Sequence, residues 1–92
     1  MDLVTFLLHV HTIAGAFGGS VTSWLRSTKH NAAVGGKLGS LHLVGLAVDL
    51  IFDDPAQKAH AAHYFARAGL WTINEGDHLH VQAWAPTGMD PT

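Results

Sequence analysis

One acidic residue, Asp49, lies inside an otherwise apolar run, Leu-Ala-Val-Asp-Leu-Ile-Phe, over residues 46–52. A short apolar run that is rich in branched side chains predicts a buried β-strand. A carboxylate in such a strand costs several kcal/mol unless a partner compensates its charge. A metal ion is one such partner, and backbone amides or Arg26 are the alternatives. The fold must therefore provide Asp49 with a polar or cationic partner.

The length of the chain, 92 residues, allows one domain with a single core, so we expect one domain over residues 1–92. Apolar residues make up 48% of the chain and charged residues 13%, a balance that excludes a disordered protein. The chain has no cysteine, which excludes disulfides, thiolate ligands and a cysteine nucleophile. Small domains without disulfides often gain stability from a bound metal.

The charge pattern argues against nucleic acid as a partner. The formal net charge is -2, and the cationic residues form no patch along the sequence. They are Arg26, Lys29, Lys37, Lys58 and Arg67.

The apolar stretch over residues 3–17 is too short to span a membrane, contains two histidines and follows Met1-Asp2 rather than a basic region. It predicts a core helix and neither a signal peptide nor a membrane span. With no export signal in view, we expect synthesis in the cytoplasm.

Periodicity and turn residues predict an α+β domain, a small antiparallel sheet with flanking helices. One helix is expected from Leu3 to the glycines at 15, 18 and 19. A second is expected over residues 55–68, with an aspartate cap before it and proline at its first position. Strands are expected over residues 20–25, 46–52, 70–73 and 78–84, and an irregular loop over residues 27–39. The inward face of the second helix is predicted to comprise Ala59, Ala62, Phe65 and Ala66.

Eight histidines in so short a chain indicate an imidazole–carboxylate metal site, of the kind that suits catalytic zinc. About half of them should be ordinary surface residues, with His60 and His63 among these. Near the C-terminus, regular strand geometry would put His78 and His80 on one face and Asp77 on the other. If Asp77 lies in the preceding turn, that geometry does not apply, and spacing alone leaves the choice open.

Three ordered motifs resemble those of the zinc D-alanyl-D-alanine peptidases and L-alanyl-D-glutamate endopeptidases, which share the hedgehog/DD-peptidase fold. Residues 40–49 match the pattern Ser-x-His-x-x-Gly-x-Ala-x-Asp. Residues 21–36 resemble the family's arginine-containing strand and the loop after it, and Asp77-x-x-His80 matches its acid-x-x-His motif. The resemblance covers residues 20–84.

This resemblance implies that His42, Asp49 and His80 bind Zn²⁺ and leave a fourth position open to water, as catalytic zinc requires. It implies that Asp77 is the catalytic carboxylate. It also implies that Arg26 faces the scissile carbonyl or a substrate carboxylate, and that Ser40 supports the ligand loop.

The implied function is hydrolysis of a peptide bond in the stem peptides of peptidoglycan, by a monomer that acts on the cell wall. Many relatives carry glutamate and tryptophan where this chain has Asp77 and Leu79, and the shorter aspartate resembles the phage endolysin-like endopeptidases. We therefore expect an L-alanyl-D-glutamate endopeptidase. The alternatives are a D-alanyl-D-alanine carboxypeptidase and a non-catalytic zinc-binding domain. His78 is an additional histidine, with a substrate contact or an alternative metal ligand as its candidate roles.

Overall fold

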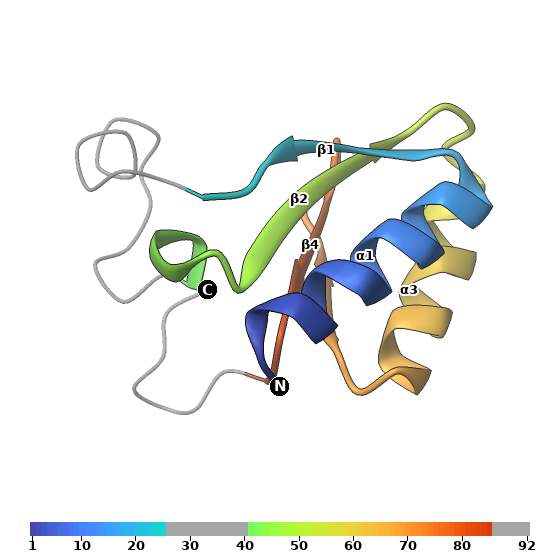
Figure 1. Ribbon diagram of the computed structural model, residues 1–92. Coiled ribbons are helices and arrows are strands. Elements are labelled where there is room, and N and C mark those ends of the chain that lie inside the picture. The colour runs from blue at the N-terminus through green and yellow to red at the C-terminus, as the bar shows by residue number, and fades with distance from the viewer. Residues whose placement is uncertain (26–40, 86–92) are drawn as a thin grey trace.

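The protein is described by a computed structural model over residues 1–25 and 41–85. Two α-helices pack on one face of a four-stranded antiparallel sheet with strand order β1-β2-β4-β3 (Figure 1). This architecture confirms the expected α+β class. The elements in chain order are α1 (Leu3–Phe17), β1 (Gly19–Ser23), the 3-10 helix η1 (Leu41–Val44), β2 (Ala47–Phe52), α3 (Gln57–Arg67), β3 (Trp71–Asn74) and β4 (Leu79–Gln82).

Helix α1 begins and ends at residues that satisfy its free backbone groups. The Asp2 carboxylate accepts a hydrogen bond from the Thr5 amide at 2.7 Å, as expected of an N-cap. Gly18, with φ of 70°, ends the helix in the left-handed conformation. Gly15 lies within the helix, so its predicted role as a terminator is wrong.

The two helices bury narrow stripes against the sheet. On α1 the stripe comprises Phe6, Val10 and Ala14, which are spaced four residues apart. On α3 it comprises Ala61 and Phe65. The predicted inward positions Ala59 and Ala66 are exposed. Phe65 points into the core, and the residue one turn earlier on the same face of the helix is Ala61.

Helix α3 is shorter at its start than predicted. Asp54 accepts a hydrogen bond from the Ala56 amide at 3.0 Å and forms a turn before the helix begins at Gln57. His60 and His63 are exposed on this helix, which confirms them as surface residues.

The two faces of the sheet carry different chemistry. Side chains from β2 and β4 form the core under the helices: Val48, Leu50, Leu79 and Val81. Because side chains alternate along a strand, Asp49 and His80 point to the opposite face. No helix in the described parts of the chain is long and apolar enough to cross a membrane.

Candidate metal centre

Asp49 and His80 meet because β2 and β4 are antiparallel in a register that places the two residues directly opposite each other. The Asp49 Oδ1 atom lies 3.1 Å from His80 Nδ1. His42, from η1, completes a triangle, with its Nε2 atom 3.4 Å from Asp49 Oδ1 and 3.4 Å from His80 Nδ1. One donor atom from each residue lies within 4.8 Å of the others, so these residues could hold a metal ion.

The three side chains differ in their exposure to solvent. The histidines are buried, at 2% exposure for His42 and 3% for His80, whereas the Asp49 side chain is 14% exposed. The triangle therefore reaches solvent on the side of Asp49. Three protein donors at a site with solvent access suit a metal that keeps one position for water.

The Trp24 backbone carbonyl orients His42. Its oxygen lies 2.8 Å from His42 Nδ1 and can only accept, so Nδ1 donates and Nε2 keeps a lone pair for a metal. The Trp24 indole in turn donates to the Gly45 carbonyl at 2.8 Å.

The structure explains why the motif over residues 40–49 has glycine at position 45. Gly45 has φ of 77°, and a Cβ atom there would lie 3.3 Å from both Trp24 Nε1 and Leu3 Cδ1. A side chain is therefore strained by the backbone conformation and crowded by two neighbours. The alanine of the motif, Ala47, is fully buried.

Gln82 stands behind His80 on the same strand. His80 Nε2 lies 2.7 Å from Gln82 Oε1, and the Gln82 amide nitrogen donates to the Trp84 carbonyl at 2.8 Å. Sequence reasoning missed both Gln82 and Trp24. Gln82 could have been found as Asp49 was, since it is a polar residue within a buried strand, but the contact of Trp24 runs through its backbone and leaves no trace in residue type.

The charges of the Asp49–His80 pair depend on each other. Burial opposes ionisation of Asp49, but hydrogen bonds with His42 and His80 outweigh it and hold the Asp49 pKa well below its usual range. Burial lowers the pKa of His80, but the hydrogen bonds with Asp49 and Gln82 raise it overall. Without metal, the ionised carboxylate and the protonated imidazole therefore stabilise each other.

Asp77 lies before the first residue of β4, so strand alternation does not decide which way it points. Its side chain is 92% exposed, and its Oδ1 atom lies 2.6 Å from His78 Nδ1. The hydrogen bond and the charge of His78 lower the pKa of Asp77. The other ring nitrogen of His78, Nε2, lies 3.9 Å from Asp49 Oδ1. His78 therefore connects Asp77 to the edge of the triangle, although it is not part of the group that could hold the metal.

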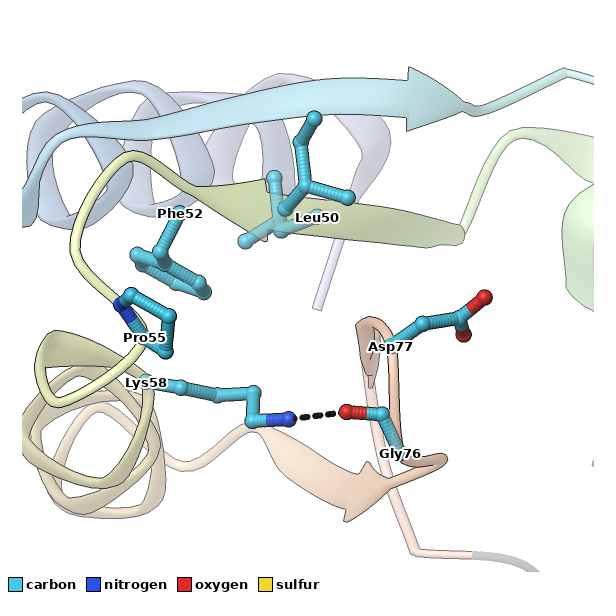
Figure 2. Close-up of a pocket in the computed structure, with 7 residues that line it drawn as sticks. Leu50, Phe52, Pro55, Lys58, Gly76 and Asp77 are labelled. Atoms are coloured by element: carbon cyan, nitrogen blue, oxygen red, sulfur yellow. Dashed lines mark hydrogen bonds between the residues drawn. The ribbon is translucent and has the colours of Figure 1, made fainter.

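The turn that carries Asp77 is anchored to the helical layer. Lys58 of α3 donates to the Gly76 carbonyl, and Asp77 lines the pocket beside this contact (Figure 2). The pocket has a volume of about 160 Å³, and its other walls are formed by Leu50, Ile51, Phe52 and Pro55. Of the remaining predicted site residues, Arg26 and Ser40 lie outside the described residues, so their roles stay predictions.

Comparison with known families agrees with this site. The family model for peptidase M15 matches residues 2–82, which include all of α1 as well as the three motifs. No similar protein was found among the curated proteins or the solved structures. M15 peptidases depend on zinc, and the His42, Asp49 and His80 group could hold that ion. The chain therefore belongs to the peptidase M15 family and is a zinc metallopeptidase.

Proposed function

We propose that this chain is an L-alanyl-D-glutamate endopeptidase that cuts the stem peptides of peptidoglycan, with zinc held by His42, Asp49 and His80. The observation that carries the proposal is the triangle of donor atoms within 4.8 Å of one another. Membership of the M15 family supports peptidoglycan as the substrate. Zinc bound here would polarise the scissile carbonyl and lower the pKa of a bound water toward about 7.

Asp77 is the proposed general base and acid. Aspartate is ionised at neutral pH, and the hydrogen bond and charge of His78 only lower the pKa of Asp77 further, so the carboxylate can accept a proton from the attacking water and later deliver it to the leaving amine. The hydrogen bond from His78 Nδ1 ties Oδ1 of the carboxylate to a ring whose other nitrogen lies 3.9 Å from Asp49 Oδ1, at the edge of the triangle. Arg26 is proposed to stabilise the oxyanion or to anchor a substrate carboxylate.

The face of the sheet that carries the triangle supports an endopeptidase. Helices α1 and α3 cover the opposite face, so neither of them closes the site. Ile51, two residues after Asp49, and Ile73, opposite His80 on β3, are 47% and 39% exposed. These side chains offer apolar contacts to a peptide that lies along the sheet on both sides of the scissile bond. A carboxypeptidase would instead need a site that ends at the D-alanyl carboxylate.

The proposed setting is that of a phage endolysin-like enzyme, made in the cytoplasm and acting on the cell wall as a monomer. Gel filtration with light scattering tests the monomer, and a second copy in solution would refute it.

Digestion of purified peptidoglycan by the zinc-loaded protein tests the activity. Mass spectrometry of the products should show free peptides that begin with D-glutamate and muramyl groups that end in L-alanine. Release of D-alanine alone would identify a D-alanyl-D-alanine carboxypeptidase. If the zinc-loaded protein cuts no bond in peptidoglycan, the proposed substrate is wrong.

A further inference from the structure

Gln82 is a fully enclosed polar residue next to the metal centre, with 1% of its surface exposed. We propose that Gln82 is a positioning residue that determines which ring nitrogen of His80 is available to the metal. This inference rests on the proposed role of His80 as a zinc ligand. Gln82 itself touches no proposed reacting atom, so its effect passes through the histidine.

The direction of each hydrogen bond follows from the Trp84 carbonyl. A carbonyl oxygen can only accept, so the Gln82 group at 2.8 Å from it must be the amide NH₂. The other end of the amide, 2.7 Å from His80 Nε2, is then the oxygen Oε1, which also only accepts. His80 must therefore carry a hydrogen on Nε2.

The second ring nitrogen of His80 faces the triangle. Nδ1 lies 3.1 Å from Asp49 Oδ1 and 3.4 Å from His42 Nε2. In neutral His80, a hydrogen on Nε2 leaves the lone pair on Nδ1. The amide at position 82 thus prepares the nitrogen that points toward the other two donors.

Burial makes this selection strong. His80 and Gln82 are both at least 97% buried, so bulk water does not readily replace a lost partner. Turning the amide by 180° would place its oxygen against the Trp84 carbonyl and leave two acceptors facing each other. An unsatisfied buried polar group costs about 1–3 kcal/mol. The opposite tautomer of His80 would meet a similar penalty, because a bare Nε2 would face the Gln82 oxygen.

Gln82 also sets the charge of the site. A carboxylate at this position could also accept from His80 Nε2, as carboxylates often do behind metal-bound histidines, but its second oxygen would face the Trp84 carbonyl. The neutral amide adds no second negative charge beside His80 to that of Asp49. A zinc ion bound here would then retain more of its positive charge for polarising the substrate carbonyl.

Nitrogen NMR of the zinc-loaded, unmodified protein tests the tautomer directly. Ring correlations of ¹⁵N-labelled histidine should show His80 with its hydrogen on Nε2 and without one on Nδ1. A hydrogen on Nδ1 would overturn the proposal without any need for a variant.

Zinc affinity, measured by competition with a chromogenic chelator, tests the energetic role. Gln82→Leu should weaken zinc binding by about tenfold to a hundredfold, the usual effect of losing a group that orients a metal-bound histidine. Gln82→Glu keeps an acceptor for His80 Nε2 but loses the donor to the Trp84 carbonyl, so it should bind zinc more tightly than Gln82→Leu and less tightly than the unmodified protein. Gln57→Leu, on α3 in the helical layer, is the matched control and should bind zinc like the unmodified protein.

His80→Ala separates this inference from the ligand assignment on which it rests. If His80→Ala loses zinc while Gln82→Leu binds it with unchanged affinity, His80 remains a ligand and the role of Gln82 is wrong. If His80→Ala itself keeps full affinity, the proposed ligand set fails first.

Discussion

Asp49 and His80 are direct cross-strand neighbours on β2 and β4, with 3.1 Å between Oδ1 and Nδ1. A shift of one residue in this register would send one of the two side chains to the helical face. The packing that sets the register, Val48 and Leu50 against Leu79 and Val81 under the helices, therefore also positions the metal centre. Folding and metal binding should be coupled for this reason.

His42→Ala and Asp49→Ala should each remove tight zinc binding, since each deletes one corner of the triangle. A zinc concentration of 1,000 times the dissociation constant stabilises a folded protein by about 4.1 kcal/mol, and both variants should lose that increment. Metal analysis after gel filtration and thermal unfolding with and without zinc provide the measurements. His60→Ala, at an exposed position on α3, is the control. Full zinc occupancy in both variants would show that the ligand set is wrong.

His80→Ala and His78→Ala should behave differently. His80→Ala should lose zinc, whereas His78→Ala should keep it, because His78 lies outside the group that could hold the metal. His78→Ala should nevertheless lower turnover, since it removes the 2.6 Å contact that holds Asp77. Metal content and kcat on the same preparations distinguish the two effects. Loss of zinc from His78→Ala alone would reverse the assignment.

Asp77→Asn should reduce kcat by about a hundredfold to ten-thousandfold, the usual contribution of a general acid–base group. The amide keeps the size of the side chain but cannot take a proton from water. Zinc content and thermal stability should remain unchanged, because the side chain is 92% exposed. Glu75→Gln, another exposed acid in the same turn, is the control and should keep its activity. An Asp77→Asn variant of full activity is incompatible with the proposed mechanism.

Gly45→Ala should destabilise the protein by about 1–3 kcal/mol, the cost of holding a side chain in an unfavourable backbone conformation. Its effect should extend to zinc binding, because the Gly45 carbonyl accepts from the Trp24 indole and Trp24 orients His42. Gly15→Ala is the matched control: it lies inside α1 with nothing within 4 Å of the added Cβ. That control should stabilise the helix by about 0.5–1 kcal/mol. Urea unfolding measures both, and equal effects would contradict the structural reason given for Gly45.

The metal-free protein should show a pH-dependent contribution from the Asp49–His80 pair. The pKa of Asp49 is lowered from 3.8, so its contribution is present above pH 3.8 and is lost as the pH falls through the folded value. The pKa of His80 is raised from 6.5, so its contribution is present below pH 6.5 and is lost as the pH rises through the folded value. The pair should therefore stabilise the fold most between pH 3.8 and 6.5.

Urea unfolding of metal-free protein and of Asp49→Asn, from about pH 4 to about pH 9, checks this window. The difference in unfolding free energy between the two proteins should shrink as the pH rises past the folded pKa of His80. Zinc affinity should change in the opposite direction and fall at acidic pH, because metal binding must displace the proton from His80. A constant difference across the range would show that the two groups are not coupled.

Local sequence patterns were sufficient to predict much of this protein. Asp2 and Gly18 mark the ends of α1 because capping depends on neighbours within four residues. An acid within an apolar strand identified Asp49, because the cost of burying a charge is independent of the fold that buries it. The resemblance of residues 40–49 and 77–80 to family motifs then supplied His42 and His80 as its partners.

The tertiary structure decided what depends on contacts between distant segments. The buried face of α3 is Ala61 and Phe65, since packing against the sheet, and not composition, sets the rotation of a helix that is rich in alanine. His78 contacts both Asp77 and Asp49. Residues 77 and 78 precede the first residue of β4, so the alternation of side chains along a strand could not predict these contacts. The carbonyl of Trp24 and the amide of Gln82 orient the two histidines, because a hydrogen bond requires a donor and an acceptor in the same place, and only the folded chain brings them there.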